Sequence, residues 1–292
     1  MKPILVFQTD FTYKEGAVCA MYGVVKTVDR DLEIFDGSHE IPQYDIHSAA
    51  YRLFQSMRFW PEGTIFVSVV DPGVGTHRRA CVAKTVDGYY VVTPDNGALT
   101  YLKKWVGLTE VREIDETRNR LHGKNTEGVS IFHGRDLFGY CAAKLASGLI
   151  SYEEVGAKYS LSEIVEFTIL EPSIKDNKVC GIFEINDPNF GNLWTNIPLS
   201  MFTEAGFNYG DYLNVNIKHE GKEMYKDKVL FHKSFGFAEK GDVVIYNNEL
   251  MKVGMAITQG NLCEKYNLNF GLEWTVEFDN LEAVESYHKL GF

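Results

Sequence analysis

Acidic residues follow three apolar runs in the first half of the chain. Asp10 follows ILVFQT, Asp71 follows IFVSVV, and Asp95 follows YYVVTP. In an open α/β sheet, ligands bind outside the carboxyl ends of the strands, so these carboxylates predict a polar ligand site at one sheet edge. A single aspartate after a strand is more often a turn former or a helix cap, which is the structural alternative for each of them.

The glycines of the DPGVGT segment, Gly73 and Gly75, would let a ligand approach the backbone closely. The segment matches neither the Walker pattern GxxxxGK[ST] nor the dinucleotide pattern GxGxxG, so a nucleotide phosphate is not indicated. The five cysteines are scattered, without a CxxC pair or a histidine at metal-ligand spacing. This pattern is typical of reduced, mostly buried thiols and favours a site without a metal ion.

A second candidate cluster is FHGRDLF at residues 132–138, which is predicted to open a helix. His133 would sit just before the first turn, where its imidazole can be exposed, and Asp136 could cap the helix. A histidine at a helix start is more often a surface residue than a catalyst, so the cluster on its own is a weak indication of a site.

A third cluster, DPNFGNLWTN, alternates polar and aromatic side chains around a glycine. Its members are Asp187, Asn192, Asn196, Phe190 and Trp194. Aromatic rings can stack on the faces of a flat heteroaromatic ligand while amides read its edge. The alternative is an ordinary β-turn with two core aromatic residues.

The elements that must position these residues fall into two types. Residues 1 to about 168 alternate short β-branched runs with helical stretches, which predicts a helix-flanked, mostly parallel sheet. Helices are expected at 16–29, 45–58, 98–105 and 135–146. From about residue 178, strands separated by turn residues predict a smaller antiparallel β-barrel-like or sandwich domain. We therefore expect an α/β protein with an N-terminal domain at 1–170, a junction at 171–177 and a C-terminal β domain at 178–285 that completes the ligand site.

The overall charge argues against two classes of partner. Lys and Arg number 29 and Asp and Glu 40, so the net charge is −11, and no run of basic residues offsets it. A phosphate backbone or an anionic bilayer would be repelled, which disfavours nucleic acid and membrane as partners. The longest apolar stretch, residues 16–25, is too short for a bilayer, and the N-terminus lacks a signal-peptide cleavage site. We expect a cytoplasmic protein that binds a small cationic or zwitterionic ligand.

Six motifs occur together in a specific order along nearly the whole chain. They are TDF near the N-terminus, HEIPxYD (39–45), VVDPGVGTxRR (69–79), PDNGAL (94–99), FHGRD (132–136) and FGNLWTN (190–196). In these motifs the chain resembles the S-adenosyl-L-methionine (SAM) hydrolases, also called SAM hydroxide adenosyltransferases, which are related to the fluorinase and chlorinase enzymes. The resemblance implies an N-terminal α/β domain, a C-terminal barrel-like domain, a homotrimer, and SAM bound between subunits without a cofactor.

The same resemblance implies a reaction. The family attaches a nucleophile to the C5′ carbon of SAM and expels methionine, and in the hydrolases an Asp-Arg-His set activates water. Asp71, Arg78 and His133 match that set. The halogenases instead replace DPGVG with a Tyr-initiated loop and carry Tyr-Ser where this chain has His133 and Gly134. The expected products are therefore adenosine and L-methionine; the alternatives are a non-catalytic SAM or adenosine binding module and a C5′ transferase that uses another nucleophile such as halide.

Substrate-binding residues carry over from the family one position at a time. Asp10 resembles the carboxylate that holds the ribose hydroxyls, and Tyr44 matches an aromatic residue beside the ligand. Asp187 and Asn192 match residues that contact the methionine part, and Phe190 and Trp194 match the walls around that part. Phe235 and the stretch starting at Met255 match residues that cover the adenine. The chain departs from the family in having Thr12 and Glu15 where TDFG and a second Asp are usual, and Thr258 where Asn is common.

Overall fold

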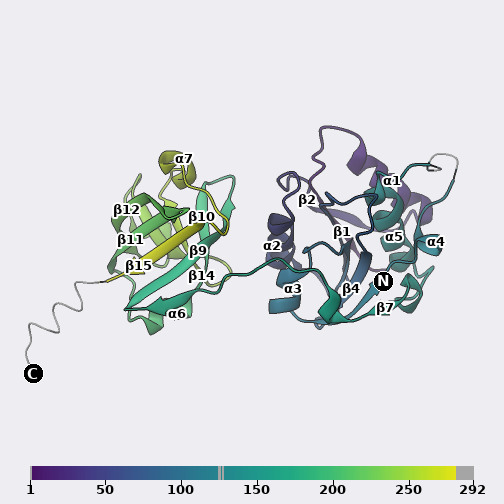
Figure 1. Cartoon of the computed structure of the whole chain (residues 1–292). Coiled ribbons are helices and arrows are strands. Elements are labelled where there is room, and N and C mark those ends of the chain that lie inside the picture. The colour runs from purple at the N-terminus through teal and green to yellow at the C-terminus, as the bar shows by residue number, and fades with distance from the viewer. Residues whose placement is uncertain (1, 124–125, 127, 281–292) are drawn as a thin grey trace, which may run out of the picture. The chain divides into compact units, whose positions relative to one another are not determined.

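The chain divides into two compact units, Met1–Phe167 and Thr168–Phe292. The computed structural model describes residues 2–123, 126 and 128–280 (Figure 1). The predicted junction at 171–177 contains a short strand, β8 (Ser173–Lys175), which belongs to the second unit. Within the described residues, no helix has the length and apolar character needed to cross a membrane.

The first unit is built on a seven-stranded sheet of order β2-β1-β3-β5-β4-β6-β7. The strands are β1 (Leu5–Thr9), β2 (Ile34–Ser38), β3 (Ile65–Val69), β4 (Ala80–Thr85), β5 (Tyr90–Pro94), β6 (Leu108–Glu113) and β7 (Lys158–Tyr159). Strands β2, β1, β3 and β5 pair in parallel. Strands β1 and β3 are buried along their whole length, as expected for central strands of a sheet covered on both faces. The α/β prediction is confirmed.

The other half of this sheet is antiparallel: β4 pairs antiparallel with both β5 and β6, and β6 pairs antiparallel with β7. Connection length explains the first of these pairs. Only residues 86–89 separate β4 from β5, whereas a parallel connection needs a crossover of about a dozen residues. The parallel strands are the ones whose carboxyl ends share an edge, and Asp10 and Asp71 follow two of them.

Helices cover both faces of the sheet (Figure 1). They are α1 (Ala17–Val28), α2 (Ile46–Met57), α3 (Thr100–Trp105), α4 (Glu116–Asn119) and α5 (Tyr140–Ser147), with 3-10 turns at Glu153–Val155 and Leu161–Glu163. Helices α1 and α5 pack together over one face, and α2 packs with α3 on the other. The core between the sheet and α5 includes Phe7, Val67 and Phe138.

The helix predicted at 135–146 is not one uniform helix. Residues Gly134–Gly139 form a π-helix, and α5 begins at Tyr140. Both end positions of the π-helix are crowded: a Cβ on Gly139 would lie 3.1 Å from the carbonyl oxygen of Gly134, and one on Gly134 would lie 3.0 Å from the ring of Phe11. Glycine is therefore favoured at both ends of this wide turn.

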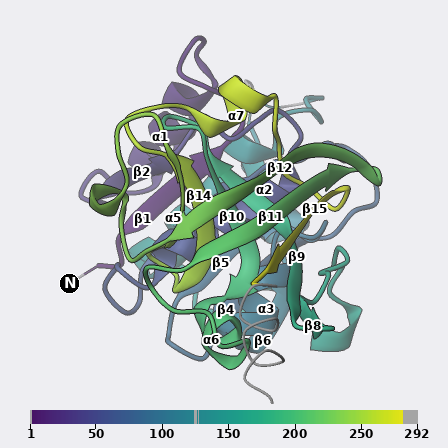
Figure 2. The same cartoon turned by 90° about the vertical axis from the view of Figure 1, so that its left-hand side faces the viewer.

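The second unit is a closed barrel of seven strands with β8 added at one side (Figure 2). Its strands are β9 (Lys178–Asp187), β10 (Asn192–Pro198), β11 (Tyr212–His219), β12 (Lys222–Phe231), β13 (Val243–Asn247), β14 (Lys252–Ile257) and β15 (Trp274–Asp279). The order β10-β14-β13-β12-β11-β15-β9 closes through pairing of β9 with β10. All pairs in the ring are antiparallel except β12 with β13. The barrel prediction is confirmed.

Apolar side chains at alternate positions along the strands fill the interior of this barrel. On β11, Leu213, Val215 and Ile217 belong to the core, and the side chains between them are more exposed. Strand β10 was not predicted, because its residues were interpreted as part of a turn and aromatic cluster. Short helices α6 (Leu199–Glu204) and α7 (Leu262–Tyr266) and a 3-10 turn at Phe235–Phe237 complete the unit.

Candidate active site

Asp71 and Arg78 form a buried ion pair at the carboxyl end of β3. Two backbone turns, closed by Val74 N–H to Asp71 C=O and Thr76 N–H to Gly73 C=O, bring the chain back on itself between them. The Nε of Arg78 donates to Asp71 Oδ1 at 2.8 Å and to Oδ2 at 3.0 Å, and Nη2 also donates to Oδ2. The side chains are only 10% and 5% exposed, so each charge is neutralised mainly by the other.

His133 adjoins this pair from the start of the π-helix. Its Nδ1 lies 3.0 Å from Nη2 of Arg78. Because a guanidinium has only donors, Nδ1 must accept, and a neutral His133 then carries its proton on Nε2. Burial, followed by the charges of Arg78 and Arg120, lowers the pKa of His133 below its usual 6.5. The contact with Arg78 therefore fixes both the charge state and the tautomer of the imidazole.

Two expectations for the FHGRDLF cluster are wrong. His133 is only 5% exposed, because its ring lies against Arg78 and does not project from a surface turn. Asp136 does not cap the helix; its carboxylate accepts from the Nε and Nη2 of Arg135 at 2.6 and 2.9 Å. The cap position is His133 itself, and it makes no side-chain cap hydrogen bond.

Asp10 lies near Asp71 at the same sheet edge. Strands β1 and β3 are parallel neighbours, with Thr9 opposite Val69, so both aspartates emerge at adjacent carboxyl ends. Asp10 Oδ2 accepts from the backbone N–H of Tyr44 at 2.9 Å. Burial raises the pKa of Asp10, and the negative charge of Asp71 adds to the effect. The structure therefore brings Asp10, Asp71, Arg78 and His133 to one edge, as the sheet argument predicted for the two aspartates.

Asp95 has a structural role instead. Its carboxylate accepts from the hydroxyl of Tyr159 at 3.0 Å and the backbone N–H of Val165 at 2.9 Å, with Arg79 Nε 3.8 Å away. These contacts attach residues 158–165 to the end of β5.

Glu15, which the family resemblance places among the binding residues, is exposed in the loop between β1 and α1.

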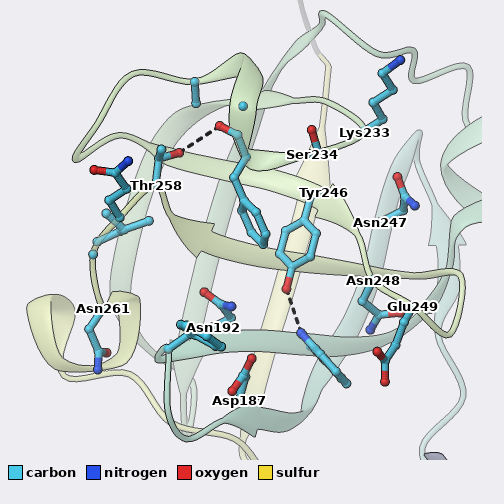
Figure 3. Close-up of a pocket in the computed structure, with 18 of the residues that line it drawn as sticks. Asp187, Asn192, Lys233, Ser234, Tyr246, Asn247, Asn248, Glu249, Thr258 and Asn261 are labelled. Atoms are coloured by element: carbon cyan, nitrogen blue, oxygen red, sulfur yellow. Dashed lines mark hydrogen bonds between the residues drawn. The ribbon is translucent and has the colours of Figure 1, made fainter.

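The second unit contains a cavity of about 1060 Å³ on the outside of the barrel (Figure 3). Five predicted binding residues line it: Asp187, Phe190, Asn192, Trp194 and Phe235. Met255 does not; it is fully buried and packs in the barrel core, because alternation along β14 points its side chain inward. Thr258 also lines the cavity, and its hydroxyl donates to the carbonyl oxygen of Phe235 at 3.3 Å.

A residue that the sequence analysis did not single out organises the cavity wall. Tyr246 accepts a hydrogen bond from Trp194 Nε1 at 2.7 Å, and its ring lies 4.6 Å from that of Phe235 (Figure 3). Burial raises the pKa of Tyr246, and the carboxylates of Asp187 and Glu249 reinforce the shift. The N–H group of Trp194 is therefore engaged by Tyr246. The alternation of apolar residues in VVIYNN, which places Tyr246 beside inward-facing Ile245, is the signal that could have identified it.

The turn before β10 presents the exposed aromatic ring. Phe190 is 61% exposed, whereas Asn192 is 7% exposed. Gly191, between them, has φ +69°, and a Cβ there would overlap the side chain of Asn261. This close approach lets the backbone N–H of Cys263 donate to Gly191 C=O at 3.1 Å. The turn thus needs glycine to hold Phe190 at the cavity.

Neither unit contains a metal site within the part of the chain that the structure describes. No group of three or more His, Cys, Asp or Glu side chains there is placed to hold a metal ion. Of the cysteines, Cys81 and Cys141 are buried, Cys180 and Cys263 are partly buried, and Cys19 is exposed.

Comparisons with known proteins agree over both units. Residues 5–156 match the SAM hydroxide adenosyltransferase N-terminal domain, and residues 183–275 match the C-terminal domain of the same family. An (R)-S-adenosyl-L-methionine hydrolase of Methanocaldococcus jannaschii is 32% identical over 84% of each chain. A fluorinase of Actinopolyspora mzabensis is 26% identical over 93% of this chain and 96% of its own.

A solved structure extends the similarity to three dimensions. The crystal structure of an uncharacterized conserved protein from Thermotoga maritima superposes with a TM-score of 0.85 at 30% identity, covering 95% of this chain and all of the other. With both domain models matched in order, the chain is an enzyme that belongs to the SAM hydroxide adenosyltransferase family.

Proposed function

We propose that this enzyme hydrolyses SAM to adenosine and L-methionine by in-line attack of water on the ribose C5′ carbon. The observation that carries the proposal is the contact of Asp71, Arg78 and His133 at the sheet edge beside Asp10. The names of the hydrolase relatives support water as the nucleophile. The fluorinase relatives make halide the competing candidate.

The reaction does not require a general acid. The leaving group departs from a sulfonium as a neutral thioether, so it needs no proton. A bond forms between the water oxygen and C5′, the C5′–S bond breaks, and its electron pair stays on the sulfur of methionine. The remaining requirement is to align the water with the C–S bond and to accept its proton.

Asp71 is the group best suited to accept that proton. The Nδ1 of His133 is occupied by Arg78 and its Nε2 carries hydrogen, so the neutral imidazole can donate to water but cannot take a proton from it. Asp71 Oδ1 accepts only from Arg78 Nε and keeps a second lone pair, whereas Oδ2 accepts from both Nε and Nη2. We assign Asp71 as the base, His133 as a donor that orients the water, and Arg78 as the cation that holds both.

SAM binding uses the remaining residues. Asp10 accepts from the ribose hydroxyls, with Tyr44 beside the ligand. In the second unit, Asp187 and Asn192 contact the methionine part and Phe235 covers the adenine. We assign Phe190 to the adenine as well, in place of the methionine wall that the resemblance implies, because its ring is exposed in the cavity that Phe235 also lines. The aromatic side chains in the lining of the cavity support this assignment, because aromatic stacking suits a purine.

We further propose that the enzyme is a homotrimer in which the first unit of one subunit and the second unit of its neighbour form each site. A mixing experiment tests this arrangement. Asp71→Asn and the double variant Phe190→Ala/Asn192→Ala are each inactive at low SAM, but after denaturation and co-refolding about a quarter of the sites regain both intact halves if sites are shared. No recovery over either variant alone contradicts shared sites, and light scattering gives the subunit number.

The central experiment is to incubate the purified enzyme with SAM in water labelled with heavy oxygen and to identify the products by mass spectrometry. We expect L-methionine and adenosine labelled at the 5′ oxygen, with the (R) epimer at sulfur consumed, as in the names of the hydrolase relatives. Halogenated adenosine as the main product in halide buffer would overturn the nucleophile assignment. Bound but unchanged SAM would establish a binding module instead.

A further inference from the structure

A chain of hydrogen-bonded side chains lies behind Asp10. Thr9, the last residue of β1, has its Oγ1 2.8 Å from Nδ1 of His39. On the other side of the ring, Nε2 lies 2.9 Å from the hydroxyl of Tyr22 and 3.2 Å from Oδ1 of Asp36. Thr9 is fully buried and His39 is 1% exposed, so neither can exchange these partners for water.

The direction of each hydrogen bond can be assigned. Tyr22 has one hydroxyl hydrogen, and it goes to Asp36 Oδ1. Both neighbours of Nε2 are then acceptors, so Nε2 of His39 carries a hydrogen. Burial lowers the pKa of His39 below 6.5, so its ring is neutral near pH 7 and Nδ1 accepts from the Thr9 hydroxyl.

The network reaches the backbone on both sides of Asp10. The backbone N–H of Phe11 donates to Thr9 Oγ1 at 3.1 Å. The carbonyl oxygen of His39 accepts from the backbone N–H of Thr12 at 2.8 Å. Thr12 has φ +58°, a conformation that a threonine rarely adopts without such support. His39 is thus linked to the residue before Asp10 by its ring and to the second residue after it by its main chain.

The segment that carries His39 also supplies a partner for Asp10 itself. Tyr44, whose backbone N–H donates to Asp10 Oδ2, lies five residues beyond His39, in the same HEIPQYD motif. The ring of Tyr13, in the loop after Asp10, lies edge-on to the ring of His39 with centroids 4.9 Å apart. The segment that carries His39 therefore helps to hold the loop around Asp10, and the His39 ring contacts both Thr9 and Tyr13 in it.

We infer that His39 is a positioning residue, which acts through the hydroxyl of Thr9 to hold the Asp10 carboxylate in place for the ribose hydroxyls of the substrate. The inference rests on the proposed function only in taking Asp10 as the ribose-binding residue. His39 does not touch the substrate in this account. Its loss therefore weakens the binding of ligands with ribose hydroxyls and leaves the chemical step nearly unchanged.

Thr9→Val tests the hydrogen bond between Thr9 and His39 with the least change in side-chain shape. Valine keeps the branched shape but cannot donate to His39 or accept from Phe11. We expect adenosine to bind about tenfold more weakly, as for the loss of one buried hydrogen bond, and KM for SAM to rise with kcat nearly constant. Thr9→Ser, which keeps the hydroxyl, should bind within about twofold of the parent. Thr64→Val is the matched control, because Thr64 is equally buried and donates to Pro61 C=O at 2.7 Å at the opposite end of β3.

A second ligand separates positioning from general damage. Calorimetry with 2′,3′-dideoxyadenosine, which lacks both ribose hydroxyls, should give the same affinity for the parent and Thr9→Val. Equal adenosine affinity in the two proteins overturns the inference, and so does an equal loss for both ligands, which would mean that the whole pocket is disturbed. If the parent itself binds neither adenosine nor SAM, the proposed function fails first, and that result is distinct from both.

Two substitutions of His39 test the roles of its two ring nitrogens separately. In His39→Asn, the amide oxygen can take the place of Nδ1 and still accept from Thr9. In His39→Gln, the amide nitrogen can take the place of Nε2 and still donate toward Asp36 and Tyr22. We expect the Asn variant to keep more adenosine affinity than the Gln variant; the reverse order at similar melting temperatures would contradict a path through Thr9.

Discussion

Asp10 and Asp71 follow the carboxyl ends of adjacent parallel strands, one and two residues beyond the paired Thr9 and Val69, and the charge of Asp71 helps to raise the pKa of Asp10. The two carboxylates differ in their partners. Asp71 is paired with the guanidinium of Arg78, whereas Asp10 accepts a backbone N–H from Tyr44. A carboxylate without a paired cation is the one free to accept hydrogen bonds from a sugar, and this difference supports separate binding and catalytic roles.

The first prediction concerns Asp71→Asn. The amide cannot accept a proton from water, so the single-turnover rate should fall by about 10²–10⁴-fold while calorimetric SAM affinity changes little. The variant also leaves Arg78 without its counter-charge, so its melting temperature should fall. Asp10→Asn is the comparison, and it should mainly weaken SAM binding. Turnover by Asp71→Asn within about threefold of the parent would remove Asp71 from the chemical step.

His133 gives a prediction about pH. Its neutral form is required, and its pKa lies below 6.5, so kcat/KM should stay level down to about that pH and fall only at lower pH. His133→Gln can keep a donor near the place of Nε2, whereas His133→Asn can keep only the acceptor for Arg78. We expect the Gln variant to retain the higher kcat and both variants to lose the part of the acid limb that belongs to His133. A higher kcat for Asn would favour the Arg78 contact as the main role of the ring.

The buried histidines also predict how stability depends on pH. His39 and His133 both have a pKa lowered from 6.5, so below that pH the unfolded chain takes up protons before the folded chain does. The free energy of unfolding therefore falls as pH drops from 6.5 toward the folded-state pKa values, at about 1.4 kcal/mol for each unit of pKa shift. Asp10, whose pKa is raised, acts in the opposite sense and loses stability as pH rises from 3.8 through its folded-state pKa.

Denaturant unfolding at about pH 7 and pH 5.5 measures this effect. The parent should lose more stability over that interval than His39→Asn, which has one titrating imidazole fewer. His77→Asn is the control, because His77 is exposed, and it should behave like the parent. Equal losses in all three proteins would mean that His39 is not kept neutral by the fold.

Phe190 is the clearest test of the second unit. Its ring is exposed at the cavity, and aromatic stacking on a nucleobase is worth about 1–3 kcal/mol, so Phe190→Ala should weaken SAM and adenosine binding by about tenfold or more. The control is Phe59→Ala, which removes a ring that is 75% exposed from the first unit outside the candidate site. Unchanged adenosine affinity in Phe190→Ala would mean that this cavity does not hold the adenine.

Periodicity and turn residues in the sequence predicted most of the elements but could not fix how they pair. The alternation at 4–93 predicts a sheet with helices, yet the antiparallel pairing of β4 with β5 depends on a connection of only a few residues. Apolar runs give no direction of pairing. Strand β10 was missed because its polar and aromatic residues resemble a turn until Leu193 and Ile197 are seen to point into the barrel.

The candidate site shows a similar limit. Residues whose role depends on chemistry at a strand end, such as Asp10 and Asp71, could be selected from spacing and family resemblance. The inward direction of Met255 and the structural contacts of Asp95 depend on register and on partners distant in sequence. His39 lies in the HEIPxYD motif and Tyr246 lies on β13, but the contacts of His39 with Thr9 and of Tyr246 with Trp194 join residues distant in sequence and could not be predicted from it.

Because Gly134–Gly139 form a π-helix, the direction in which the His133 side chain points depends on the number of residues in this turn. A π-turn is an α-helix that has gained one residue, so deleting one residue there would let α5 continue backward with regular hydrogen bonds. That deletion would turn His133 by about 100° around the helix axis, away from Arg78. The helix would become more regular, but the contact between His133 and Arg78 would be lost. Such a deletion would therefore favour helix stability at the expense of activity.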